Sequence, residues 1–215
     1  MKQIDCFLIG HNEIGVNRHN QLIRLLYGKN SKNYTETAKY HLSHIRCEDG
    51  YYTPSQLYNL VVHGDGTKID IADTFSLTIA YLGSYLHRHG FSFNYVNSFH
   101  KESDQDKLAH YLEKGNIGAI AITTTYYLTV LPVLDIVRFI RKHNADVPII
   151  LGGPYIRNQI KFLPEDELYA LFESLGGDYY VDSGEGVQSL ALLLDAIKYK
   201  KPLHHVPNLY YREGG

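Results

Sequence analysis

The chain has 215 residues, of which 44% are apolar and 20% are charged, as in soluble globular proteins that bury a core of their own. Its formal net charge of −2 at pH 7 lacks the basic excess of nucleic-acid-binding proteins, which excludes that class of partner. No segment is apolar for the roughly 18 residues of a transmembrane helix, and the start (MKQIDCFLIGHNE) is not a signal peptide, so we expect no membrane partner and a cytoplasmic location.

The first predicted element is a buried strand, the apolar run Ile4–Ile9 that stops at Gly10. Residues 10–73 then show no clear repeating unit. Because this stretch is too long for a connecting loop, we predict that it is an insertion or cap within the domain, and one hypothesis makes it a partner-binding cap. Its predicted elements are a helix near Asn20–Tyr27, a helix opened by Pro54 and Ser55, and a turn at His63–Gly66.

Helices and strands alternate through the rest of the chain. The first of these helices, Phe75–His89, is expected to be capped by Asp73 and Thr74 and ended by Gly90. The later predicted helices are Asp104–Lys114, Leu131–His143, Pro164–Leu175 and Val187–Tyr199. The predicted strands are Phe91–Val96, Ile117–Ile122, Val147–Leu151 and Tyr179–Val181.

The central strands are apolar along their whole length, which is typical of strands buried on both faces. Alternation with crossover helices indicates a parallel sheet. We therefore predict a doubly wound α/β fold, flavodoxin-like and Rossmann-like, with a five-stranded parallel sheet over residues 1–203. The last segment, 204–215, leaves the pattern and is interpreted as an exit strand or linker.

Ligands of open parallel sheets bind beyond the carboxyl ends of the strands, and four segments fall at that edge. Three of them carry glycine, which lets a ligand approach the backbone, and the fourth offers hydroxyl groups. Each segment alone is more typical of a turn, a strand end or an exposed loop than of a ligand site, but their shared edge favours a cofactor site. The candidate residues are Gly10, His11, Asn12, Glu13, Thr123, Thr124, Thr125, Tyr126, Gly152, Gly153, Pro154, Tyr155, Ser183, Gly184, Glu185 and Gly186.

Five short motifs between Ser76 and Arg212 occur together in a known family. In order and spacing they resemble the cobalamin-binding domain of class B radical-SAM enzymes. The N-terminal FLIGHNE is similar to the subset with a long insertion after the first strand, which includes phosphinate P-methyltransferases. The motifs are SLTIAYLGSYLHRHG (Ser76–Gly90), IGAIAIT (Ile117–Thr123), VPIILGGPY (Val147–Tyr155), DYYVDSGEG (Asp178–Gly186) and VPNLYYR (Val206–Arg212).

Two features depart from the family's pattern. Val187 stands where GEGE motifs have a second glutamate, which puts a side-chain role at this position in doubt. The three-cysteine cluster motif is also absent, since the only cysteines are Cys6 and Cys47. The resemblance therefore implies that the iron–sulfur cluster and S-adenosylmethionine bind a C-terminal radical-SAM domain missing from this chain, and that the fragment alone is inactive.

The resemblance implies cobalamin as the cofactor. Its nucleotide tail would lie near the glycines of GGPY and SGEG, and Thr123–Tyr126 would face the corrin. We expect the base-off form without a histidine ligand, because Ile9 and Ile14 replace the Asp and Gly that flank His11 in the histidine-ligating motif D-x-H-x-x-G. The parent enzyme would transfer a methyl group from S-adenosylmethionine, through methylcobalamin, to a small-molecule or peptide substrate.

Other readings of the sequence are less well supported. The twelve histidines are scattered, and the close pair His87 and His89 point to different sides of a helix, so no protein metal site is predicted. A dinucleotide-binding glycine motif and a P-loop lysine are both absent. The alternative that stays open is a stand-alone flavodoxin-like module for a flavin, a nucleotide or a protein partner.

Overall fold

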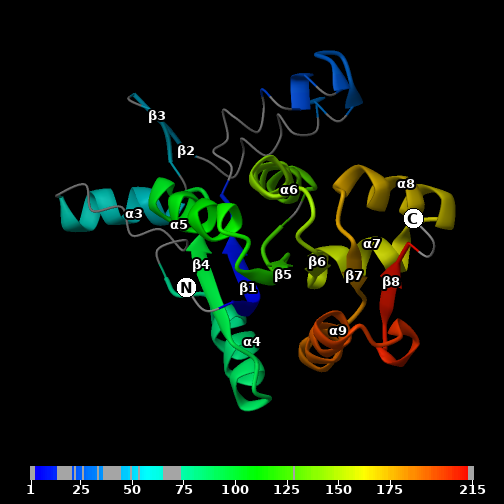
Figure 1. The fold of residues 1–215 in the computed structure, drawn as a ribbon. Helices are drawn as coiled ribbons and strands as arrows, with labels where there is room; N and C mark the ends of the chain where they lie inside the picture. Colours follow the sequence, from blue (N-terminus) through cyan, green and yellow to red (C-terminus); the bar gives the residue numbers. More distant parts are fainter. Residues whose placement is uncertain are drawn as a thin grey trace. The chain divides into compact units, whose positions relative to one another are not determined.

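A six-stranded sheet with the strand order β4-β1-β5-β6-β7-β8 lies between two layers of helices (Figure 1). The first five strands in this order pair in parallel, and β8 pairs antiparallel with β7 at the edge. The predicted doubly wound α/β fold is therefore confirmed, with one antiparallel strand added. The strands are β1 (Ile4–His11), β4 (Phe93–Ser98), β5 (Ile117–Thr123), β6 (Ile149–Gly152), β7 (Tyr179–Val181) and β8 (Leu209–Tyr211).

The structure is a computed structural model that describes residues 3–13, 21, 23–25, 27–32, 34–35, 45–48, 50–52, 54–64, 74–127 and 129–212. The chain divides into two compact units. Residues 1–13 and 75–215 form the unit that contains the sheet, and residues 14–74 form the second. In the second unit, β2 (Ile45–Cys47) and β3 (Gly50–Tyr52) pair antiparallel and precede α3 (Pro54–His63).

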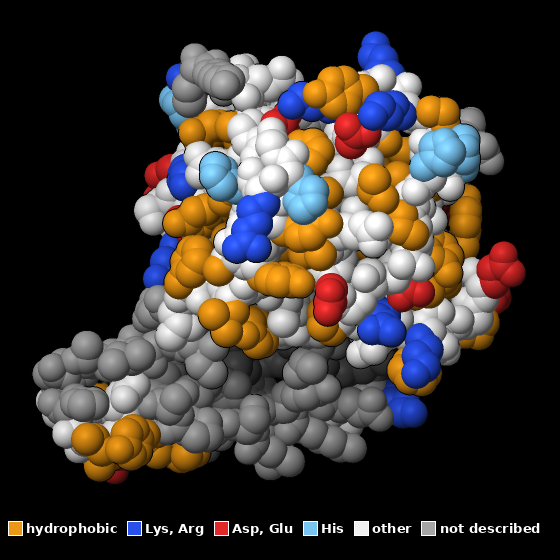
Figure 2. All heavy atoms as spheres, turned by 90° about the horizontal axis from the view of Figure 1, so that it is seen from below, with side chains coloured by type: hydrophobic (Ala, Val, Ile, Leu, Met, Phe, Trp, Pro, Cys, Tyr) orange, Lys and Arg blue, Asp and Glu red, His pale blue; other side chains and the backbone are white. Residues whose placement is uncertain are grey.

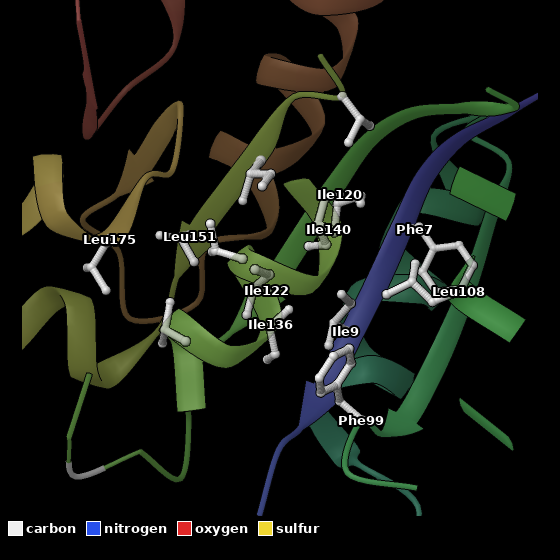
Figure 3. Close-up of a cluster of buried hydrophobic side chains, with 14 of the residues drawn as sticks. Phe7, Ile9, Phe99, Leu108, Ile120, Ile122, Ile136, Ile140, Leu151 and Leu175 are labelled. Carbon is white, nitrogen blue, oxygen red and sulfur yellow. The ribbon is translucent and has the colours of Figure 1, made fainter. Parts of the chain in front are cut away.

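The helices cover both faces of the sheet because its central strands carry apolar side chains on both faces. In β1, Phe7 and Ile9 enter one core while Cys6 and Leu8 enter the other, as the alternation of side chains along a strand requires. Figure 3 shows the first core. Helices α5 (Glu102–Glu113), α6 (Leu131–His143), α7 (Pro154–Phe162) and α8 (Glu165–Leu175) close the first core, and α4 (Leu77–Arg88) and α9 (Val187–Tyr199) close the second.

Most predicted elements of the sheet unit occur within a few residues of their expected bounds. The predicted cap of α4 at Thr74 is wrong, because the N-cap is Ser76, whose side chain accepts the hydrogen bond from the Ile79 amide. Gly90 follows the C-cap His89 in the left-handed region, with φ of 79°. Asp73 lies outside the described residues, and of the helix expected near Asn20–Tyr27 the structure shows residues 21, 23–25 and 27 as helical.

Among the described residues, four elements were not expected from the sequence: β2, β3, α7 and the short 3-10 helix η3 (Leu203–His205). Strand β8 lies in the segment interpreted as an exit strand or linker. Among the helices of the described residues, none is long and apolar enough to cross a membrane.

Candidate functional site

A cleft of about 360 Å³ opens between the first turns of α4 and α9, over the carboxyl ends of β5, β6 and β7. Both helices begin at this edge of the sheet. Ser76, the N-cap of α4, donates its amide hydrogen to Asn97 Oδ1 at 2.8 Å, near the end of β4, and α9 starts directly after the loop that follows β7. The cleft therefore lies at the edge where ligands of open α/β sheets bind.

The cleft has an apolar inner end and a more polar mouth. The inner side chains come from both walls and the floor, and each is at most 8% exposed: Leu82, Ala121, Ile150, Val181 and Leu190. The lining residues nearer the solvent include Thr78, Thr125, Ser183 and Glu185. Figure 2 views the molecule from the side of α4 and α9 and shows hydrophobic side chains exposed among charged ones. At the cleft, Leu77 and Tyr81 of α4 are 80% and 52% exposed.

Two consecutive glycines at the end of β6 shape the floor. A Cβ atom on Gly152 would meet no atom closer than 3.5 Å, and strand alternation turns it to the same face as Ile150, into the cleft. Gly153 has φ of 111°, and a Cβ there would lie 3.0 Å from both the amide nitrogen and Oγ1 of Thr124. Glycine is thus required at position 153 by the positive φ and the close approach of Thr124. At position 152, glycine leaves space in the cleft that a side chain would fill.

The SGEG loop forms the wall next to α9. Ser183 Oγ accepts a hydrogen bond from the Gly186 amide at 2.9 Å, and Gly186, with φ of 66°, is the N-cap of α9. No side chain caps this helix, so its first amides remain available to a polar or anionic group at the cleft mouth. Val187, which stands in place of a glutamate, is buried and does not line the cleft.

The residues of the TTTY segment (Thr123–Tyr126) have different environments. Thr123 Oγ1 donates to the Ile9 carbonyl at 3.2 Å, and Thr125 Oγ1 lies 3.2 Å from Thr78 Oγ1, which links the loop after β5 to α4. Thr124 is fully buried and donates to the Gly152 carbonyl at 2.9 Å. Its role is to hold the β5 and β6 ends together. Tyr126 is 59% exposed and packs edge-on against His11 rather than lining the cleft.

The first predicted segment, Gly10–Glu13, does not line the cleft. Asn12 is 1% exposed and donates to the Pro132 carbonyl at 3.0 Å and to Asp135 Oδ2 at 3.3 Å. The Glu13 amide donates to His100 Nδ1 at 3.3 Å. Asn12 and Glu13 therefore contact the start of α6 and the loop after β4, whereas Gly10 faces α4, where an added Cβ would meet the Ile79 side chain.

The side chain of His11 lies among aromatic rings. Its ring centroid is 5.9 Å from that of Tyr126 and 6.0 Å from that of Tyr127. Tyr127 donates its hydroxyl to the Gly10 carbonyl at 3.2 Å, and burial raises the pKa of this hydroxyl, so it stays a donor. His11 lies at the carboxyl end of β1, where it lines a small pocket with Ser76, Thr123 and Thr125, the last two of which also line the cleft.

The GGPY segment is also split. Gly152, Gly153 and Pro154 line the cleft, whereas Tyr155 packs against the core on the other face. The α4 residues of the cleft wall were not predicted as site residues from the sequence; they are Leu77, Thr78, Tyr81 and Leu82. Among the residues that the structure describes, no group of three His, Cys, Asp or Glu side chains could hold a metal ion.

The comparison with solved structures agrees with this fold, whereas the comparisons by sequence found no match. No protein-family model matches the sequence, and no curated protein matches it. A solved structure, that of the cobalamin-dependent S-adenosylmethionine radical enzyme OxsB with aqua-cobalamin and S-adenosylmethionine bound, is similar with a TM-score of 0.51 and 18% sequence identity. The match covers 65% of this chain and 18% of the OxsB chain. The chain thus shares the fold of part of a cobalamin-dependent radical enzyme and corresponds to less than a fifth of that enzyme's length.

Proposed function

We propose that this chain is the cobalamin-binding module of a cobalamin-dependent radical-SAM enzyme, and that the cleft between α4 and α9 holds the nucleotide tail of the cofactor. The observation on which the proposal rests is the lining of this cleft. Three of the four loops selected from the sequence contribute to its lining, together with the first turns of two helices. The similarity in fold to OxsB, which binds aqua-cobalamin, supports it.

The dimensions of the cleft suit the tail rather than the whole cofactor. Its volume of about 360 Å³ is at the lower end of small-molecule sites, enough for a heteroaromatic base with its ribose but too small for a corrin ring. The macrocycle would then lie outside, against the rim formed by Leu77, Tyr81 and Thr125. Exposed apolar side chains at this rim, such as Leu77, would be covered by it.

In this proposal the chain's own residues bind and orient the cofactor. The glycines of β6 and the SGEG loop bring backbone close to the tail, and the uncapped first turn of α9 offers amides to its phosphate. Cobalamin would supply the methyl-transfer chemistry. Binding in the base-off form without a histidine ligand is proposed from the sequence, because Ile9 and Ile14 replace the Asp and Gly of the histidine-ligating motif.

We further propose that the whole enzyme is a methyltransferase acting on a small molecule or peptide. Its iron–sulfur cluster and S-adenosylmethionine would bind a radical-SAM domain outside these 215 residues. This part of the proposal rests on the motifs between Ser76 and Arg212.

The first test is whether filling the cleft prevents cofactor binding. The purified chain is mixed with hydroxocobalamin, desalted and examined by its visible spectrum, and the dissociation constant is measured by titration. We expect retention of the corrinoid with a base-off spectrum. Gly152→Leu should weaken binding by about tenfold or more, equivalent to about 1.4 kcal/mol, because the new side chain occupies the space of the tail.

Two control variants separate cleft filling from general effects. Gly152→Ala adds a single methyl group that meets no atom closer than 3.5 Å and should cost much less affinity. Lys142→Leu places a leucine at an exposed position on α6, across the sheet, and should bind as the unmodified chain does. Failure to retain cobalamin, or retention of flavin mononucleotide in its place, would rule out the proposal and favour a flavodoxin-like binding module.

A further inference from the structure

The inner end of the cleft lacks groups that could satisfy a polar base. Its side chains are Leu82, Ala121, Ile150, Val181 and Leu190, all of them hydrocarbon and buried. Its floor is the middle of the sheet, where β6 pairs with β5 on one side and with β7 on the other. The backbone amides and carbonyls of this floor are therefore committed to the sheet ladders.

The hydroxyl groups of the cleft already have partners, and those of Thr78, Thr125 and Ser183 lie nearer the solvent than that of the buried Thr123. Thr123 Oγ1 bonds to the Ile9 carbonyl, and Thr125 Oγ1 pairs with Thr78 Oγ1. Ser183 Oγ accepts from the Gly186 amide. Thr78, Thr125, Ser183 and the first amides of α9 can meet a sugar or phosphate at the mouth, whereas the hydroxyl of the buried Thr123 is committed to the Ile9 carbonyl.

From this division we infer that the cleft selects cobamides by their lower base, preferring an apolar base such as dimethylbenzimidazole to a purine. The inference rests on the proposed function and specifies its ligand. An adenine base would carry its exocyclic amine and extra ring nitrogens into the inner end. Each such group would lose its water without gaining a hydrogen bond, which is costly in a buried site. The methyl groups of dimethylbenzimidazole would instead contact Ile150, Val181 and Leu190.

The test compares three corrinoids on the full chain. They are cobalamin, pseudocobalamin (the adenine analogue) and cobinamide, which lacks the nucleotide tail, each titrated by visible absorption under the same conditions. We expect cobalamin to bind about tenfold or more tightly than pseudocobalamin, a difference of about 1.4 kcal/mol or more. Cobinamide should bind more weakly than cobalamin, because it leaves the cleft empty.

A substitution at the inner end sharpens the test. Val181→Thr keeps nearly the same shape while adding a hydroxyl group, so it should narrow the ratio of the two dissociation constants. Val147→Thr makes the same change at a buried residue of the opposite core and should leave the ratio unchanged. Thermal unfolding of each variant establishes that it is folded before titration, and the ratio of constants is insensitive to a uniform loss of affinity.

The outcomes distinguish the inference from the function on which it rests. If no corrinoid binds, the proposed function fails and the inference fails with it. If cobinamide binds as tightly as cobalamin, the tail does not occupy the cleft. If cobalamin binds more tightly than cobinamide but no more tightly than pseudocobalamin, cobalamin binding stands and base selection alone is overturned.

Discussion

Asp5 ties three parts of the sheet unit together at the amino end of β1. Its Oδ1 atom lies 2.7 Å from Lys198 Nζ on α9, and its Oδ2 atom accepts hydrogen bonds from the amide and hydroxyl of Ser92, each at 2.8 Å. Burial raises the pKa of the carboxyl, but the bonds from Lys198 and Ser92 outweigh it and hold the pKa below its usual value. The charged form is therefore stabilised in the folded state.

This pKa shift predicts acid sensitivity. Because the folded-state pKa of Asp5 is lowered, its stabilisation is fully present above the unfolded-state value of about 3.9 and is lost as the pH falls through the folded-state value. Asp5→Asn should lower the free energy of unfolding at pH 7 by about 1–2 kcal/mol, and the gap between variant and unmodified chain should shrink below about pH 4. Urea unfolding at several pH values measures both quantities.

The exposed Asp106 on α5 provides the control for this prediction. Asp106→Asn should change the free energy of unfolding by less than about 0.5 kcal/mol. If the difference in free energy of unfolding between Asp5→Asn and the unmodified chain stayed constant down to pH 3, the ionised carboxylate of Asp5 would not be what stabilises the fold.

At the scale of elements, one buried amide joins the end of β1 to α6. Asn12 Nδ2 donates to the Pro132 carbonyl and to Asp135 Oδ2, and Asn12 lies outside the cleft lining. Asn12→Ala should therefore lower the free energy of unfolding by about 1–3 kcal/mol while leaving the dissociation constant for cobalamin within about twofold, since twofold is only about 0.4 kcal/mol. Denaturant unfolding and spectral titration of the same preparation check the two effects.

If Asn12→Ala instead lowered the affinity for cobalamin tenfold or more, about 1.4 kcal/mol, with little change in the free energy of unfolding, Asn12 would belong to the binding site rather than have a structural role. Asn12→Asp offers a second variant, because it would place a carboxylate against the Pro132 carbonyl and Asp135 and should destabilise the chain as well.

The elements predicted best from the sequence are those whose buried residues form a continuous or regularly spaced apolar pattern along the chain. The strands β5 and β6 read as continuous apolar runs because both faces are buried, and helices such as α6 and α9 have long apolar faces. Helix α7 was missed because it has nine residues and its one buried side chain is Ile156, too few for a helical period to emerge. The antiparallel pairing of β8 with β7 was not predicted, because it joins Val181 to Leu209, a contact that no local pattern encodes.

The candidate site shows the same limit. The rule that ligands bind beyond the carboxyl ends of strands selected the loops, and three of the four contribute to one cleft. It could not select the wall from α4, because Leu77 and Tyr81 read as ordinary positions of an amphipathic helix. It also could not separate Thr124 and Asn12, whose polar groups bond within the protein, from residues that face the cleft.

At the scale of the whole molecule, the division into two units predicts that the sheet unit folds without residues 14–74. The two ends that a shortened chain must join lie close together. The Glu13 amide bonds to His100 and the Ser76 amide bonds to Asn97, both at the end of β4. A flexible Gly/Ser linker of about ten residues, with a root-mean-square span of about 18 Å, should therefore replace residues 14–74 without strain.

The shortened chain should unfold cooperatively, retain the secondary structure of the sheet unit by circular dichroism, and bind cobalamin with nearly unchanged affinity, because all residues that line the cleft belong to the sheet unit. If residues 14–74 form a partner-binding cap, the same deletion should abolish capture of a partner that the full chain retains. A folded chain that no longer binds cobalamin would show that residues 14–74 contribute to the cofactor site. An unfolded chain would show that the two units are not independent.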